Sequence, residues 1–160
     1  MPFYLSISNF SKKETIPGQF QVEIYDSLTE NQAISFLKLQ ELATSEISQE
    51  INILSKAGLT SNLPGKAKCF LILLLYNTEN LVGYGYSYED VFKGTIYIDT
   101  IFVLKKYRGQ RLGHIIVESL IEKSVNQLPS VNRFKAVTQP NNEAAIKLLT
   151  NLGFKHTINL

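Results

Sequence analysis

The chain has 160 residues and a formal net charge of +2 at neutral pH. That length fits one domain, and a chain of this size buries about 70% of its unfolded surface, so its core needs neither disulfides nor a structural metal. Hydrophobic residues make up 44% and charged residues 19%, which excludes the composition of a disordered chain. The single cysteine, Cys69, excludes an intramolecular disulfide. We therefore expect one globular domain over residues 1–160.

Neither the apolar nor the basic segments indicate a membrane or a nucleic acid. The longest apolar run, Cys69 to Tyr76, is much shorter than the roughly 20 residues of a membrane-spanning helix, so we expect a buried strand there. The N-terminus lacks a basic segment followed by an apolar segment and a cleavage site, which favours a cytoplasmic location. An excess of two positive charges does not favour duplex binding unless the cations cluster on one face.

The first third of the chain has a strand pattern followed by helix patterns. Residues 19–26 alternate between apolar and polar side chains, which predicts a half-buried strand. Residues 30–47 are rich in helix formers, and Thr29 with Gln32 has the spacing of a capping box, so a helix is predicted there. A second helix is predicted over residues 49–56, ending near the next glycine of the chain.

The middle of the chain has three strand patterns in quick succession. They span residues 68–77, 81–88 and 95–104 and are joined by the turn-rich sequences NTEN and EDVFKG. This spacing predicts an antiparallel meander. The period then becomes helical over residues 111–127, and Pro129 forbids its continuation.

The C-terminal part has a short strand pattern, a helix pattern and a final short strand pattern. Residues 134–138 predict the first strand, Asn142 is suited to cap the helix, and Gly153 is suited to end it. Residues 155–158 predict the last strand. This order of strands and helices predicts an α+β or mixed α/β sheet domain rather than a helical bundle or a sandwich.

A basic, glycine-containing turn joins the third strand of the meander to the helix that follows it. The free N–H groups and the dipole at a helix start favour an anion, and Gly109 and Gly113 let a phosphate group approach the main chain. Four cations surround the turn: Lys105, Lys106, Arg108 and Arg111. On spacing alone, a solvated basic loop explains these residues equally well. The turn matches neither GxxxxGKS/T nor GxGxxG, which disfavours a nucleoside-triphosphate or dinucleotide fingerprint.

This turn resembles the Q/R-x-x-G-x-G/A loop of the GNAT superfamily of acyl-CoA-dependent N-acyltransferases. Arg108 and Gly113 match its first and last places, and Arg111 stands at the place of the middle glycine. An arginine fits there if its φ is negative, because its backbone N–H can then still point at the phosphate.

A second segment resembles the family motif N-x-x-A-x-x-L-Y-x-x-x-G-F. It is matched by Asn142, Ala145, Leu148, Gly153 and Phe154. Leu149 stands at the place of the tyrosine. The resemblance is specific over residues 81–154, and it implies a GNAT-like α/β (α+β) fold with a mixed, largely antiparallel central sheet flanked by about four helices.

The resemblance also implies how acyl-CoA would be bound. The main chain from Ile101 to Val103 would bind the pantetheine arm and polarise the thioester carbonyl, and the main chain from Gln110 to His114 would cradle the pyrophosphate. Asn142 would contact pantetheine, although its role as a helix cap is enough to explain it. The implied acyl-CoA contacts are Ile101, Val103, Arg108, Gln110, Arg111, Leu112, Gly113, His114 and Asn142.

Asp99 is the candidate general base, because it lies on the strand where many GNAT enzymes place a carboxylate. A base is needed since an ammonium acceptor is no nucleophile until it loses a proton. Regular strand alternation would put Asp99 on the same face as Tyr97 and Ile101. The opposite face would carry Ile96 and Ile98. An ordinary polar residue on the solvent side of the sheet is the alternative.

Three tyrosines, Tyr84, Tyr86 and Tyr88, alternate with small residues and so share one face of the neighbouring strand. Each is a candidate to bind the acceptor or to protonate the departing thiolate, and packing against a helix is the alternative. The family's usual acid is the tyrosine that Leu149 replaces, so the acid is unassigned. Two widely separated histidines and one cysteine support neither a metal site nor a Cys-His dyad.

The sequence thus predicts an N-acyltransferase, and an acetyltransferase in particular. It would pass the acyl group of acetyl-CoA or another acyl-CoA directly to an amine in a ternary complex, as a monomer or homodimer, without a metal. Two alternatives remain: a noncatalytic acyl-CoA-binding or sensor domain, suggested by Leu149, and nucleic-acid binding through the basic loop. The identity of the acceptor and the acyl length carry no signal in the sequence.

Overall fold

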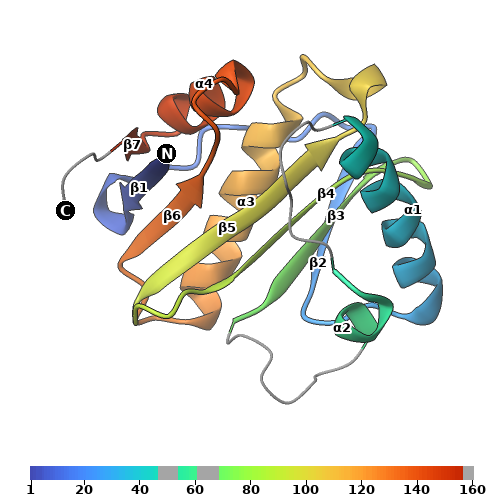
Figure 1. Cartoon of the computed structure of the whole chain (residues 1–160), viewed down its shortest axis with the longest axis horizontal. Coiled ribbons are helices and arrows are strands. Elements are labelled where there is room, and N and C mark those ends of the chain that lie inside the picture. Colours follow the sequence, from blue (N-terminus) through green and yellow to red (C-terminus); the bar gives the residue numbers. More distant parts are fainter. Residues whose placement is uncertain (47–53, 61–68, 157–160) are drawn as a thin grey trace.

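The computed structural model of the chain describes residues 1–46, 54–60 and 69–156. Its strands and longer helices are β1 (Pro2–Ser6), β2 (Phe20–Tyr25), α1 (Glu30–Glu46), α2 (Lys56–Thr60), β3 (Leu71–Asn77), β4 (Asn80–Glu89), β5 (Thr95–Val103), α3 (Leu112–Gln127), β6 (Arg133–Val137), α4 (Glu143–Asn151) and β7 (Lys155–His156). Figure 1 shows one twisted sheet with α1 and α2 on one face and α3 on the other. No helix among these residues is long and apolar enough to cross a membrane.

The described residues form a seven-stranded sheet in the order β2-β3-β4-β5-β6-β1-β7. All neighbouring strands are antiparallel except β5 and β6, which are parallel. The predicted meander is therefore confirmed, as is the mixed, largely antiparallel sheet with four helices in the described part. β5 pairs with β6 over Thr95–Tyr97 only, although β5 continues to Val103. The remaining edge of β5 borders the site described below.

β1 is a strand that the sequence analysis does not predict. It lies between β6 and β7 and pairs antiparallel with both. Phe3 and Leu5 are 3% and 1% exposed, so the strand has one buried face. The alternation that produces this face is only five residues long and precedes a polar stretch, which is why the period-two signal was missed.

The predicted capping box of α1 is confirmed. The backbone N–H of Gln32 donates to Thr29 Oγ1, and the backbone N–H of Thr29 donates to Gln32 Oε1. The second helix differs from its prediction: α2 begins at Lys56 and includes Gly58, while residues 49–53 lie outside the described residues. The reason is a serine cap, because Ser55 Oγ accepts the N–H of Gly58 at 3.1 Å and starts the helix there.

Two other predicted boundaries differ by a few residues. β3 begins at Leu71 rather than at 68, and residue 68 lies outside the described part of the chain. Cys69, just before it, has a φ of 52°, which no extended strand adopts. The last predicted strand is described as β7 over Lys155–His156, and its remaining residues, 157–158, also lie outside the described ones.

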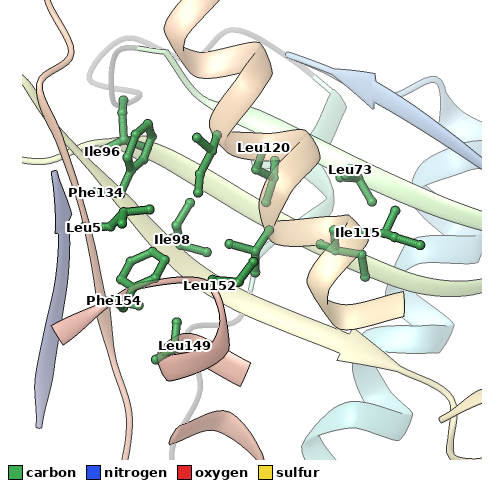
Figure 2. Close-up of a cluster of buried hydrophobic side chains, with 14 of the residues drawn as sticks. Leu5, Leu73, Ile96, Ile98, Ile115, Leu120, Phe134, Leu149, Leu152 and Phe154 are labelled. Carbon is green, nitrogen blue, oxygen red and sulfur yellow. The ribbon is translucent and has the colours of Figure 1, made fainter. Parts of the chain in front are cut away.

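Alternation along the strands divides the core between the two faces of the sheet. The cluster on the side of α3 and α4 includes Leu5, Leu73, Ile96, Ile98, Ile115, Leu120, Phe134, Leu149, Leu152 and Phe154 (Figure 2). The cluster on the side of α1 includes Phe36, Ile72, Leu74, Tyr84, Tyr86 and Phe102. A Cβ on Gly85 would lie 2.6 Å from Ile116 Cγ2, so this glycine lets α3 pack closely on β4. The helix that carries the candidate phosphate loop is thereby fixed to the sheet.

Candidate active site

A cleft of about 660 Å³ lies along the part of β5 that does not pair with β6. Its walls come from the end of α1, from β5, from the loop and first turn of α3, from the end of β6, and from α4. Of the predicted site residues, it is lined by Asp99, Ile101, Val103, Arg108, Arg111, Leu112, Gly113, His114 and Asn142. Gln110 and the three tyrosines of β4 are not among its lining residues.

β5 contains a bulge at Asp99. Tyr86 of β4 faces Thr100 and Ser87 faces Ile98, so Asp99 is an extra residue between two regular pairs. The bulge resets the alternation of the strand. Ile101 consequently packs with the cluster on the α3 side, and the prediction that Asp99 and Ile101 share a face is wrong.

Hydroxyl groups hold the carboxylate of Asp99. The Tyr88 phenol donates a hydrogen bond of 2.6 Å to Oδ2, and Thr100 Oγ1 donates one of 3.0 Å to Oδ1. The Thr100 hydroxyl is also hydrogen-bonded to the Tyr86 phenol at 3.2 Å. These contacts fix the orientation of the carboxylate, and Asp99 and Thr100 both line the cleft. Asp99 therefore has a carboxylate of fixed orientation in the wall of the cleft, and its role as a base stays a prediction.

Tyr84 and Tyr86 are core residues, with side chains 0% and 1% exposed. Tyr84 packs on Phe36 of α1, with 4.5 Å between ring centroids, and on Phe102 of β5. Tyr88 is only half-buried and stacks on Phe70. Tyr84 and Tyr86 are thus packed in the core, and Tyr88 lies against the candidate base.

The three phenols are weak proton donors in this environment. Burial, and then the charge of Asp99, raises the pKa of Tyr84 well above its usual range. Burial also raises the pKa of Tyr86, and burial together with the hydrogen bond to Asp99 raises the pKa of Tyr88. A phenol with a raised pKa gives up its proton less readily, so this environment disfavours these tyrosines as acids for a thiolate.

In the loop before α3, Arg111 adopts the left-handed backbone conformation that is typical of glycine. This residue has a φ of 61°, so the condition of a negative φ is not met. A left-handed conformation costs a non-glycine residue roughly 1 kcal/mol. Gly109 also has a positive φ, of 86°, and space around its missing Cβ. A Cβ on Gly113 would lie 2.6 Å from Leu148 Cδ1, so this glycine allows α4 to approach the start of α3.

Arg108 connects the loop to two other parts of the cleft. Its Nε donates to the carbonyl oxygen of Val103 at 2.9 Å, and its terminal nitrogen pairs with the Glu46 carboxylate at 2.6 Å. Glu46 ends α1 and also lines the cleft. One lone pair of the Val103 carbonyl, which the resemblance assigns to pantetheine, is therefore occupied by a side chain of the same protein.

Arg111 is held by the N-terminal segment. Its Nε donates to Glu14 Oε1 at 2.6 Å. The buried carboxylate of Glu118 in α3 accepts the backbone N–H groups of Lys13 and Glu14, at 2.8 and 3.1 Å, and so fixes that segment to the helix. A phosphate group that binds Arg108 or Arg111 must share each cation with a carboxylate.

His114 lies in the first turn of α3 and lines the cleft. Its Nε2 is buried, and within the described residues it has no hydrogen-bond partner. Burial, and then the charge of Arg111, lowers the pKa of the imidazole below its usual value. A neutral imidazole has one nitrogen that donates and one that accepts, so it offers a hydrogen bond to a ligand in the cleft.

The cleft is also lined by Asn142, the N-cap of α4, and by residues of α4 that include Leu149. Asn142 Oδ1 accepts the backbone N–H of Ala145 at 3.1 Å, which confirms its role as a helix cap. Leu149, at the place of the family tyrosine, is 5% exposed and belongs to the core cluster of Figure 2. Its hydrocarbon side chain also lines the cleft, so it contributes shape and no proton.

Sequence reasoning missed the acidic partners Glu14 and Glu46 and the cleft residue Thr138. The partner of Arg108 lies 62 positions away in the chain and that of Arg111 lies 97 away, and no local pattern links such pairs. Within the described residues, no group of three or more metal-ligating side chains is suited to hold a metal ion.

The sequence model of the acetyltransferase (GNAT) family matches residues 34–154 of the chain. The chain belongs to the GNAT family. The matched region contains most of α1, the whole meander, the candidate phosphate loop and α4. The resemblance seen in the two motifs is thereby confirmed. A search of the curated proteins finds no match.

Solved GNAT structures share this fold. A tandem GNAT protein from the clavulanic acid biosynthesis pathway has a TM-score of 0.70 at 15% identity, and the alignment covers 96% of this chain and 49% of that one. The present GNAT chain thus spans about half the length of the tandem protein. The aminoglycoside acetyltransferase meta-AAC0020 from an uncultured soil metagenomic sample, in complex with trehalose, has a TM-score of 0.67 at 16% identity and coverages of 91% and 96%.

A further similar structure contains bound CoA. Aminoglycoside N-acetyltransferase AAC(6')-Iy in complex with CoA has a TM-score of 0.62 at 15% identity, with coverages of 91% and 95%. At 15–16% identity, the similarity to these structures establishes the GNAT fold of the chain and nothing about its substrate.

Proposed function

We propose that this chain is an N-acetyltransferase that moves the acetyl group of acetyl-CoA directly to an amine. The observation that carries the proposal is the composition of one cleft. The start of α3, the unpaired edge of β5 and the Asp99 carboxylate all line it. A phosphate site, a main-chain edge for the pantetheine arm and a base are the parts that direct transfer requires, and this single cleft contains a candidate for each.

Each part of the cleft has a separate task in the proposed reaction. The N–H groups at the start of α3 bind the pyrophosphate, since unpaired helix N–H groups and the helix dipole favour an anion. Asp99 takes a proton from the ammonium form of the acceptor, directly or through water. The amine nitrogen then attacks the thioester carbonyl carbon, the C–S bond breaks, and CoA leaves as a thiolate that must gain a proton.

We infer that water or the amine's own proton protonates this thiolate. Leu149 has no proton to give, and the raised pKa values of the β4 tyrosines disfavour a phenol. A thiolate is a tolerable leaving group, because the reference pKa of a thiol is about 8.5. No covalent intermediate on the protein is needed.

The proposal is tested by acetyl-CoA binding and by release of free CoA in the presence of amines. The amine panel contains aminoglycosides, because two of the similar structures are aminoglycoside acetyltransferases, together with polyamines and peptides with free amino groups. We expect acetyl-CoA to bind and at least one amine to release CoA. Binding without CoA release across the panel would favour the noncatalytic acyl-CoA sensor, which the hydrocarbon at position 149 suggests. Absence of acetyl-CoA binding would contradict both functions.

A further inference from the structure

Five buried side-chain atoms in the described part of the chain have no hydrogen-bond partner. They are Tyr84 Oη, Ser87 Oγ, Asp90 Oδ2, His114 Nε2 and Thr138 Oγ1. Of the residues that carry them, only His114 and Thr138 line the cleft. Buried polar atoms are normally hydrogen-bonded, so a buried atom without a partner in the wall of a cleft indicates a contact to a ligand. His114 lies at the phosphate end, whereas Thr138 has no role in either sequence motif.

Thr138 directly follows β6, beyond the three residues over which β6 pairs with β5. Its backbone N–H donates to the Met1 carbonyl at 3.1 Å, so the main chain is held while the hydroxyl has no partner among the described residues. Phe134 and Ala136 belong to the core cluster on the α3 side, and strand alternation extends this row to Thr138. The side chain is 6% exposed.

The lining of the cleft that contains Thr138 is mostly apolar. Ile98, Val117, Ala136 and Leu149 belong to it, whereas Arg108 and Arg111 line it at the α3 loop and Lys147 lines it from α4. A ligand segment that suits the apolar lining is uncharged and largely aliphatic, with a few groups that form hydrogen bonds. The amide-containing pantetheine arm of an acyl-CoA has this chemistry, and its adenosine phosphates do not.

We propose that the Thr138 hydroxyl binds an amide group of the pantetheine arm and thereby positions the thioester beside Asp99. The inference rests on the proposed function, because it needs acetyl-CoA in this cleft. A hydroxyl both donates and accepts, so it can pair with either the N–H or the carbonyl of an amide. Thr138 thus adds a side-chain hydrogen bond to the main-chain contacts that the family motif implies.

The test compares Thr138→Val, which keeps the shape and removes the hydroxyl, with Thr138→Ser, which keeps the hydroxyl and removes a methyl group. Acetyl-CoA affinity is measured by calorimetry. We expect Thr138→Val to bind about tenfold more weakly, the equivalent of one hydrogen bond, and Thr138→Ser to bind within about twofold of wild type. The melting temperature of the free protein should show the reverse order, because valine removes an unpaired buried hydroxyl whereas serine loses buried methyl contacts.

Two comparisons separate ligand binding from a structural effect. Adenosine 3′,5′-diphosphate lacks the pantetheine arm, so its affinity should be the same for wild type and Thr138→Val. Ser87→Ala removes another unpartnered hydroxyl, on a fully buried residue that does not line the cleft, and it should leave acetyl-CoA affinity unchanged.

The failure of this inference differs from the failure of the proposed function. If wild type does not bind acetyl-CoA, the proposed function is wrong and this inference fails with it. If wild type binds acetyl-CoA and Thr138→Val binds it equally well, the inference alone is overturned. Equal losses of acetyl-CoA and adenosine 3′,5′-diphosphate affinity in Thr138→Val would also overturn it, because the effect would then not involve the pantetheine arm.

Discussion

The two sides of the cleft are built on different principles. The proposed cofactor side comprises the α3 loop, the end of β6 and α4. The proposed acceptor side comprises the end of α1 and the bulge of β5, which β4 supports from behind the cleft wall. On the proposed cofactor side, the close packing of α4 against the start of α3 requires a glycine at position 113, and the start of α4 requires a capping residue at position 142. Both requirements are visible in the local sequence. On the acceptor side, side chains from distant segments meet through packing, as Tyr88 and Asp99 do. A site made from main chain leaves a local motif, and a site made from packed side chains does not.

The strongest test of the acceptor side is Asp99→Asn. We expect turnover to fall by about 10²–10⁴, the contribution of a positioned base, with acetyl-CoA affinity unchanged. The loss should shrink as pH rises, because more of the acceptor is then already deprotonated. Steady-state kinetics with an accepted amine measure both effects. Asp90→Asn, in the β4–β5 turn, is the matched control and should keep wild-type turnover.

Near-normal turnover of Asp99→Asn at neutral pH would identify Asp99 as an ordinary strand residue. The side chains that pack around Asp99 would then have a structural role only, and the proposed acceptor side would contain no base.

On the cofactor side, Gly113→Asp should abolish acetyl-CoA binding. The new carboxylate repels the phosphates, and even its Cβ meets Leu148 of α4 at 2.6 Å. The Gly113→Ala variant separates the two causes, since it adds the Cβ without the charge and should weaken binding less. Gly18→Asp is the control, because nothing lies within 4 Å of a Cβ at that position. Affinities are measured by calorimetry, and unchanged binding by Gly113→Asp would exclude this loop as the phosphate site.

The sequence predicted features that depend on neighbouring residues better than contacts between distant segments, on both sides of the cleft. The capping box of α1, the cap at Asn142 and the junction between β5 and α3 depend on residues a few positions apart, and the structure has all three. The role of the junction in phosphate binding stays a prediction. The salt bridge between Arg108 and Glu46 depends on how α1 packs on the sheet, and no residue pattern encodes that distance.

The errors on β5 and in the α3 loop also have physical causes. Strict alternation put Asp99 and Ile101 on one face, because a bulge has no signature in a run of apolar and β-branched residues. An arginine was taken to fit the place of the middle glycine only with a negative φ, because most non-glycine residues avoid the left-handed region, but its φ is 61°. In both cases the local preference was overridden by the fold around it, at the very residues that line the cleft.

Leu149 lies at the boundary between the core and the cleft, and Leu149→Tyr tests which of the two it serves. We expect a loss of about 1–3 kcal/mol in the free energy of unfolding, because the site is 5% exposed and the added atoms overpack it. Leu149→Met, which nearly conserves the volume, should cost less than about 1.5 kcal/mol. Urea unfolding provides the free energies. A clear gain of turnover in Leu149→Tyr would show that the missing acid limits the wild-type reaction.

His114 predicts a modest pH dependence of stability on the cofactor side. Its pKa is lowered by burial and then by Arg111, so the unfolded chain takes up the proton first as pH falls below the reference value of 6.5. The free energy of unfolding should therefore fall as pH decreases from about 6.5 toward the lowered pKa and be unaffected by this group at higher pH. His114→Gln should remove this component, and His156→Gln, at an exposed site, should keep it. A pH profile identical in wild type and His114→Gln would contradict the assignment.

The smallest expected effect concerns Arg111, where the cofactor side departs from its own motif. Arg111→Gly relieves a left-handed conformation worth roughly 1 kcal/mol, but it adds unfolded-state entropy of about 0.5–1 kcal/mol and loses the half-exposed pair with Glu14, worth at most about 1 kcal/mol. These terms nearly cancel, so its stability should lie within about 1 kcal/mol of wild type. Arg111→Ala loses the same ion pair and keeps the strain, so it should be less stable than Arg111→Gly, by up to about 0.5 kcal/mol in urea unfolding. An alanine variant clearly more stable than the glycine variant would show that residue 111 does not have the φ of 61°, and the main chain of the loop would then differ from the one that forms the phosphate site.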